Sequence, residues 1–244
     1  MERQRSTLQR IFGVSPLSEE TRPWYRGALG EIPVGGILAG LGPDWLVLHA
    51  VPVGTGSTDI DHVLVGPAGV FTINTKNHSG QPVWVAGRTL MVAGKKTRHL
   101  YNAAHEAARA SKLLSAAAGY SVDVTAVVVI VAPKTLTIKS APEQVKVLTE
   151  RQLVRWLKRR PSVLDPDQIS RIAAAAVVPG TWHRNPAVPG DAVTIQQNFA
   201  GLRSLVDQAR RRRAGWVLGV PAAGFVMLVT GGPLGTIIQA LTGR

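Results

Sequence analysis

Residues 58–77, with the sequence T-D-I-D-H-V-L-V-G-P-A-G-V-F-T-I-N-T-K-N, decide the fold of this chain. Two runs rich in β-branched and aromatic residues flank Gly66-Pro67-Ala68-Gly69, a combination of turn-forming residues. The stretch therefore predicts a β-hairpin with a four-residue loop, in which Val65 pairs with Val70.

The alternation of side chains along these strands predicts a cluster of polar groups on one face of the sheet. Asp59 and Asp61 share a face of the first strand, and Asn74 and Lys76 share a face of the second. The expected register places Asp61 opposite Asn74 and Asp59 opposite Lys76, with opposed Cβ atoms about 4.5–5.5 Å apart. A slip of one residue would move Asn74 and Lys76 to the other face of the sheet, so the prediction depends on this register.

Two carboxylates, an amide oxygen and an ammonium group in this arrangement suit a magnesium site. Mg²⁺ prefers hard oxygen ligands and is held by one or two carboxylates together with water and substrate phosphate. Such an ion lowers the pKa of a bound water and neutralises charge that develops on a phosphate. The spacing alone leaves a second interpretation open, in which Asp59 and Lys76 form a simple cross-strand ion pair on a partly solvated sheet.

The rest of the chain predicts an α/β fold with a mixed sheet. A helix is expected from about Glu31 to Leu41 if Pro33 lies in its first turn, and Asp165 is expected to cap a helix that begins at Pro166. The other expected elements are strands at 45–53, 124–131 and 145–148, a hairpin at 82–92, and helices at 150–160 and at 101–118, the latter ended by Gly119.

The central block of the sequence resembles the NERD (nuclease-related) domain. The residues that carry the resemblance are Gly30-Glu31, Ile60-Asp61-His62-Val63, Gly66-Pro67-Ala68-Gly69-Val70-Phe71, Ile73-Asn74-Thr75-Lys76-Asn77 and Gly80. It extends over about Trp24 to Arg160. The NERD family is similar to the PD-(D/E)XK nucleases, so the resemblance implies a restriction-endonuclease-like mixed sheet flanked by helices.

The resemblance also implies a catalytic and metal-binding site. Glu31 matches the helix glutamate of the family, Asp61 its metal-binding aspartate and Lys76 the lysine of the (D/E)-X-K element. Asn74 stands where the family has an acidic residue, although its amide oxygen can still bind a hard cation. The implied activity is hydrolysis of nucleic-acid phosphodiesters with Mg²⁺ or Mn²⁺, with DNA expected ahead of RNA. The alternative is a catalytically degenerate nuclease fold that binds nucleic acid or protein.

Three further residues lie close to this cluster in the sequence. Asp59 is on the same strand face as Asp61 and offers a second carboxylate, and His78 follows Lys76 on the same alternating face, within reach of a phosphate. His62 matches a histidine that follows the family aspartate. Because side chains alternate, His62 points away from Asp61 and is expected to pack or to act indirectly.

The net charge of +13 favours a polyanionic partner. The expected helix at 150–160 presents Arg151, Arg155, Lys158 and Arg159, which we interpret as a nucleic-acid-binding surface. A merely solvated basic face would look the same in the sequence. The chain has no cysteine, which excludes disulfides, cysteine-ligated zinc and thiol catalysis.

The C-terminal part predicts attachment to a membrane, because no charged residue occurs between Ala214 and Gly243. Four arginines and a tryptophan are expected to flank the span on its cytoplasmic side, namely Arg210, Arg211, Arg212, Arg213 and Trp216. The expected organisation is a lead-in at 1–23, a nuclease-like domain at 24–178, a linker and basic segment at 179–213, and a single-pass anchor at 214–241. The alternative is a cytoplasmic protein without an anchor whose C-terminal segment is buried in an oligomer; the oligomeric state stays open.

Overall fold

The computed structural model describes residues 5–53, 59–183 and 192–230. The chain divides into two compact units. The larger comprises Trp24–Ala187, and the smaller combines Met1–Pro23 with Val188–Arg244. The expected domain limits at 178 and 213 stay predictions.

The larger unit is built on a five-stranded mixed sheet with the order β1-β2-β3-β7-β9. The antiparallel part is formed by β1 (Leu46–Pro52), β2 (Asp59–Gly66) and β3 (Gly69–Asn77). The parallel part is formed by β7 (Val124–Val131) and β9 (Val145–Thr149), which continue the sheet beyond β3. The expected mixed α/β sheet is therefore confirmed.

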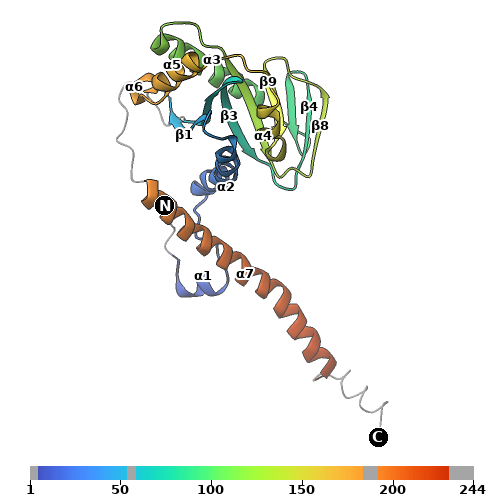
Figure 1. Cartoon of the computed structure of the whole chain (residues 1–244). Coiled ribbons are helices and arrows are strands. Elements are labelled where there is room, and N and C mark those ends of the chain that lie inside the picture. The colour runs from blue at the N-terminus through green and yellow to red at the C-terminus, as the bar shows by residue number, and fades with distance from the viewer. Residues whose placement is uncertain (1–4, 54–58, 184–191, 231–244) are drawn as a thin grey trace. The chain divides into compact units, whose positions relative to one another are not determined.

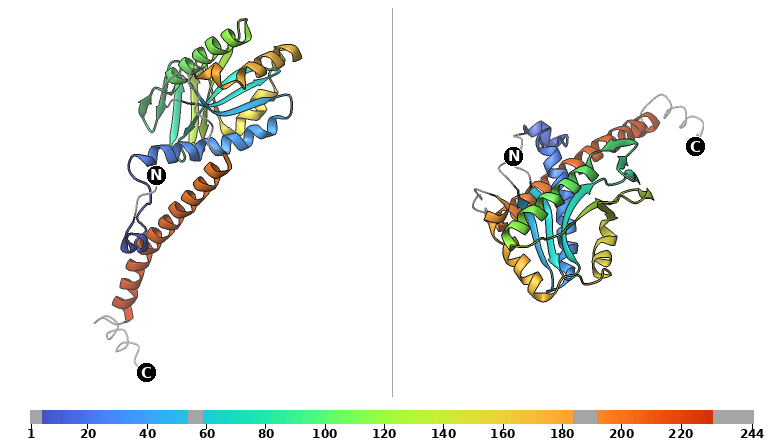
Figure 2. Two further views of the ribbon diagram at one scale, coloured as in Figure 1. Left: turned by 90° about the vertical axis from the view of Figure 1, so that its left-hand side faces the viewer. Right: turned by 90° about the horizontal axis from the view of Figure 1, so that it is seen from above.

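Helices cover both faces of this sheet (Figure 1). One face packs against α2 (Thr21–Leu38), the short 3₁₀ helix η1 (Ala39–Leu41) and α4 (Glu150–Lys158). The other packs against α3 (His99–Ala118), α5 (Pro166–Ala176) and α6 (Pro179–Trp182). Figure 2 shows α2 and α3 on opposite sides of the strands, so a ligand site between them would draw residues from both faces.

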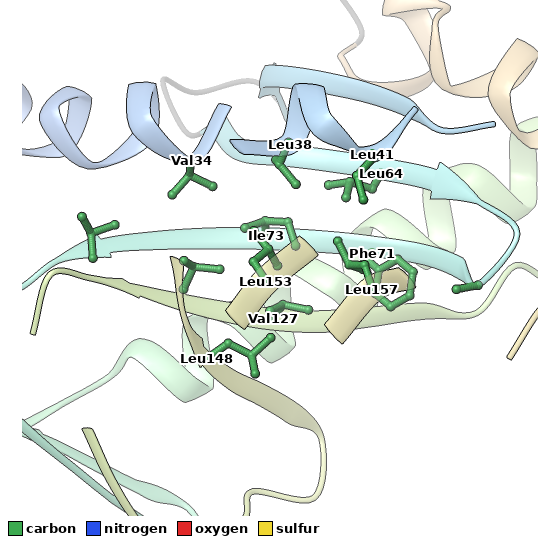
Figure 3. Packing of buried hydrophobic residues seen from close by; sticks show 13 residues of the cluster. Val34, Leu38, Leu41, Leu64, Phe71, Ile73, Val127, Leu148, Leu153 and Leu157 are labelled. Carbon is green, nitrogen blue, oxygen red and sulfur yellow. The ribbon is translucent and has the colours of Figure 1, made fainter. Parts of the chain in front are cut away.

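The α2 side of the sheet has a continuous apolar core (Figure 3). Leu38 from α2 and Leu153 and Leu157 from α4 are buried against Phe71 and Ile73 of β3. Burying such a side chain stabilises the fold by about 1.5–3 kcal/mol. This packing holds β3, the strand that carries Asn74 and Lys76, against two helices.

Helix α2 begins at Thr21, well before the expected start at Glu31, and Pro33 lies inside it. Proline removes one backbone hydrogen bond and strains a helix interior. Val34 and Leu38 on the same helix are buried in the core, and tertiary packing of this kind outweighs local propensity. The expected start of this helix at Glu31 was wrong because it rested on helix propensity alone.

A second, four-stranded sheet lies beside the first and has the order β6-β5-β4-β8. The hairpin of β4 (Pro82–Ala86) and β5 (Thr89–Val92) was expected, whereas β6 (Lys95–Thr97) and β8 (Thr135–Ser140) were not. Strand β8 pairs in parallel with β4, so its partner is distant in the sequence. Most residues of β8 are exposed, so β8 lacks the apolar alternation by which a strand is recognised in a sequence.

The smaller unit contains α1 (Thr7–Ile11) and α7 (Ala192–Thr230). Arg212 Nη1 donates a hydrogen bond to the Arg10 carbonyl at 3.0 Å, and Trp216 Nε1 donates one to the Ile11 carbonyl at 2.9 Å. The Phe12 and Trp216 rings lie 5.1 Å apart. Two of the residues expected to flank a membrane therefore contact the N-terminal segment.

Within the ranges that the structure describes, no helix has an apolar stretch long enough to cross a bilayer. A span needs about 20 apolar residues in one helix. The part of α7 that follows the arginine run contains Pro221 and ends at Thr230. The expected membrane-spanning helix at 214–241, and with it the single-pass location, is therefore not supported; its residues 231–241 lie outside the described ranges.

The basic run of α7 lies on the same helix as Trp216. Arg210, Arg211 and Arg213 have exposed side chains. The assignment of Arg210, Arg211, Arg212, Arg213 and Trp216 as membrane-flanking stays a prediction.

We expect the Gly66→Ala variant to be less stable than the native chain by about 1–3 kcal/mol. A Cβ atom at this position would overlap the indole ring of Trp45, which packs against the Phe71 ring with centroids 6.0 Å apart. Urea unfolding followed by circular dichroism measures the difference. Gly40→Ala is the matched control, because a Cβ there meets no atom within 4 Å. Equal stabilities of the two variants would contradict this packing.

Candidate active site

The hairpin of β2 and β3 has the register that the sequence predicts. Val65 pairs with Val70, and Val63 pairs with Thr72. Gly66 and Gly69 also pair, so only Pro67 and Ala68 connect the strands, and the expected four-residue loop was wrong. The regular ladder ends at the pair His62–Ile73, one residue before Asp61 is reached. Beyond this pair, a side chain rather than the backbone joins the two strands, because Asp61 Oδ2 accepts a hydrogen bond from the Thr75 backbone N–H at 2.6 Å. Asp61 is thereby held across the open end of the hairpin.

Asn74 faces α3 and is 4% exposed. Its Nδ2 donates to both carboxylate oxygens of Glu106, at 2.9 and 2.8 Å. Its Oδ1 is buried and has no hydrogen-bond partner among the described residues. A buried amide oxygen without a partner costs stability, so this atom is free to accept a hydrogen bond or bind a cation.

The sequence reasoning missed Glu106. The signal was present, because Glu106 is the only acidic residue in α3 and lies three positions after the buried Ala103 and four before the buried Ala110. Residues three and four positions apart share one side of a helix. Only the packing of α3 on the sheet shows that this side meets Asn74.

Glu31 reaches the site from the opposite face of the sheet. The helix α2 passes close to the end of β3 at Gly30, where a Cβ atom would lie 3.1 Å from the Asn77 side chain and 3.3 Å from that of Thr75. Burial raises the pKa of Glu31; the nearby Asp61 charge raises it further, and Lys76 opposes the shift. Glu31, Asp61 and Lys76 therefore share one electrostatic environment.

Burial disfavours the charged form of the acidic side chains of the site. Burial raises the pKa of Asp61, while Lys76 and the hydrogen bond from Thr75 lower it. Burial also raises the pKa of Glu106, against the hydrogen bond from Asn74. Burial also raises the pKa of Asp59, and the alternative of an Asp59–Lys76 ion pair stays a prediction.

Two histidine pairs border the cluster. His62 is buried, and its Nδ1 lies 2.8 Å from His49 Nδ1, on the α2 side of the sheet. Burial and the neighbouring His49 lower the pKa of His62 to about 4. His78 Nε2 lies 3.0 Å from His99 Nε2, and burial, with Lys76 as the second cause, lowers the pKa of His78. His78 is thus beside Lys76, where the sequence placed it.

The basic residues of α4 are not part of this cluster. Arg151, Arg155, Lys158 and Arg159 are exposed, and α4 packs on the face of the sheet opposite to α3. The following residue, Arg160, places its guanidinium 5.0 Å from the centre of the Trp156 ring. Any role of α4 in nucleic-acid binding stays a prediction.

The donor set fits a hard divalent cation. Asp61, Glu31 and Asn74 offer oxygen atoms, which Mg²⁺ and Mn²⁺ prefer, and Asn74 Oδ1 lacks any other partner. Among the described residues, no three Asp, Glu or His side chains form a metal-binding group by themselves. The amide oxygen, substrate phosphate and water would therefore have to complete the coordination.

We expect Asp61→Asn to stabilise the chain at pH 7 in the presence of a chelator. A raised pKa means that the folded state binds the proton more tightly than the unfolded state, so Asp61 lowers stability as the pH rises from its unfolded pKa, about 3.9, through its folded value. Thermal unfolding from pH 3.5 to 7.5 should show a gap between variant and native chain that widens with pH. Asp123→Asn, at an exposed position, is the control. A gap that is absent at pH 7 would contradict the burial of this charge.

Part of the chain is similar to known proteins. Residues 26–131 match the family model of the nuclease-related domain, NERD. An uncharacterized protein of Bacillus anthracis is 39% identical over 69 residues, which cover 27% of this chain and 31% of the relative. The chain thus spans under a third of that relative, and no solved structure matches it. The matched segment includes Glu31, Asp61, Asn74 and Lys76, and this part of the chain is similar to the nuclease-related domain (NERD) family.

Proposed function

We propose that this protein hydrolyses phosphodiester bonds of nucleic acid with the help of Mg²⁺ or Mn²⁺. The observation that carries the proposal is the buried, unpartnered Oδ1 of Asn74 on the strand that also carries Lys76, beside the Asp61 carboxylate. The match to a nuclease-related domain supports the same reaction class.

The metal would be held by oxygen atoms of Asp61, Asn74 and Glu31, and when bound it would lower the pKa of a water molecule and offset charge on the phosphate. Asp61 is fixed by the Thr75 N–H, so its second oxygen stays free for binding. Lys76 is the cation of the cluster and would hold the attacking water or a phosphate oxygen. Its charge also lessens the repulsion between Asp61 and Glu31.

His78 and Asp59 would play supporting roles. His78 lies beside Lys76, and burial lowers its pKa, so at neutral pH the ring is uncharged and accepts or donates a single hydrogen bond. A neutral ring is suited to orienting water or phosphate rather than to binding it by charge. Asp59 is exposed at the start of β2 and would add negative charge at the rim of the site.

The substrate is expected to be DNA ahead of RNA. The exposed arginine and lysine side chains of α4 would bind the phosphate backbone away from the site of cleavage, an interaction that weakens as salt is raised. The second candidate function is a non-catalytic binding module, which is favoured by the neutral Asn74 at a position where the family has an acid.

We expect the full-length chain to cleave plasmid or single-stranded DNA with Mg²⁺ or Mn²⁺ and to be inactive with a chelator. Asp61→Ala and Lys76→Ala should each lower the rate about 100-fold or more, because each removes charge stabilisation of several kcal/mol. The controls are Asp123→Ala and Lys139→Ala, which remove exposed residues of the same charge elsewhere. The readout is the amount of substrate cut over time on a gel.

Intact DNA and RNA after incubation with folded native protein and metal would contradict the enzymatic proposal. Binding of the same substrates, measured by fluorescence anisotropy and lost on combined substitution of Arg151, Arg155, Lys158 and Arg159, would then support the binding module. Cleavage that persists in Asp61→Ala would show that the activity does not come from the proposed site.

A further inference from the structure

A pocket outside the candidate active site lies between α3 and the four-stranded sheet. Its volume is about 550 Å³, which is within the usual range for pockets that bind small organic groups. It is bounded by the turn between β4 and β5, the start of α3 and the segment that joins β8 to β9. Among its lining residues are Arg88, Leu100, Tyr101, Ala104, Pro142 and Glu143. Apolar and aromatic side chains therefore stand beside charged ones in this pocket.

Tyr101 contributes an aromatic ring to the pocket, and the side chain is 61% exposed. Two other planar groups lie against this ring. The Arg98 guanidinium is 4.9 Å from the centre of the ring, and the His105 ring is stacked on it with centroids 6.3 Å apart and 20° between the planes. The Tyr101 ring is thereby held in place while most of the side chain stays accessible to a ligand.

The surface of α3 around Tyr101 is basic. Exposed basic residues follow Tyr101 at intervals of four, four and three positions, namely His105, Arg109 and Lys112. Residues at this spacing lie along one side of a helix. The acidic residue of α3, Glu106, faces β3, where it accepts two hydrogen bonds. This charge favours a polyanionic ligand for the surface that surrounds Tyr101.

The first turn of α3 connects this surface to the candidate active site. His99 Nε2 lies 3.0 Å from His78 Nε2, and the charge of Lys76 acts on both rings. Tyr101 belongs to the same helical turn as His99. A nucleic-acid strand with one phosphate at Lys76 would therefore cross this turn and bring a neighbouring nucleotide to Tyr101.

We propose that Tyr101 and its pocket bind an unpaired base of single-stranded nucleic acid. The base stacks with the Tyr101 ring, and Arg98, Arg109 and Lys112 bind phosphates of the same strand. A base inside a duplex is paired and stacked on its neighbours, so it enters such a pocket only after it is flipped out. The inference rests on the proposed function, since that function makes nucleic acid the ligand. It adds a preference for single strands.

The test is binding of fluorescently labelled DNA by the full-length chain in chelator, where the proposed cleavage is prevented. Fluorescence anisotropy compares a single strand with a duplex of the same sequence. Tyr101→Ala should weaken binding of the single strand about 5- to 150-fold, the range for loss of one base stacked on an aromatic ring, and should leave duplex binding unchanged. Tyr101→Phe keeps the ring and should bind as the native chain does. The control Val177→Ala removes an exposed apolar side chain at the end of α5.

A second variant tests the pocket separately from the exposed ring. Ala104→Leu narrows the pocket and keeps Tyr101, so it should also weaken binding of the single strand. Loss in Tyr101→Ala without loss in Ala104→Leu would overturn the role of the pocket. Equal affinity of Tyr101→Ala and the native chain for the single strand would overturn the whole inference, and so would an equal loss for single strand and duplex. Thermal unfolding should give Tyr101→Ala the melting temperature of the native chain, because the side chain is mostly exposed.

Cleavage assays with Mg²⁺ or Mn²⁺ on the same proteins distinguish this inference from the proposed function. Cleavage by the native chain, with single-strand binding unchanged in Tyr101→Ala, would overturn the inference alone. Single-strand binding that depends on Tyr101, without any cleavage, would overturn the proposed reaction and support the inference. Native protein that neither binds nor cleaves DNA or RNA would overturn both.

Discussion

The register of β2 against β3 is the constraint on which the rest of the molecule depends. With Val65 opposite Val70, Leu64, Phe71 and Ile73 enter the core on the α2 side, and Val63, Val65 and Val70 enter the core on the other side. A shift of one residue would displace Phe71, which is fully buried. Core packing therefore selects the pairing that also brings Asp61 to the Thr75 backbone N–H.

The cluster itself opposes stability. Asp61, Glu31 and Glu106 are partly or largely withdrawn from water, their pKa values are raised, and one buried amide oxygen has no partner. The large apolar core around β3 offsets this cost, since the sheet is covered by helices on both of its faces. Such local unfavourable arrangements are a common property of functional sites, where the missing interaction is supplied by what binds there.

The pair of Asn74 and Glu106 joins strand β3 to helix α3 through two hydrogen bonds. A carboxylate on α3 reaches the strand position because α3 packs directly across β3 and β7. Helix and strand contribute to one polar cluster from facing layers of the fold. In the smaller unit, too, the role of a residue depends on a distant segment, because Trp216 contacts Phe12 and the Ile11 carbonyl.

The sequence by itself determined the hairpin, its register, the mixed α/β class, the caps at Gly119 and Asp165, and the position of Asp61 beside the end of β3. All of these follow from short-range rules: alternation along strands, turn chemistry and helix capping. Tertiary structure alone decided the features that depend on packing between distant segments. These features are the continuation of α2 past Pro33, the pairing of the exposed β8 with β4, and the hydrogen bond between Asn74 and Glu106. These contacts join residues many positions apart, and no local pattern in either partner encodes the approach of the other.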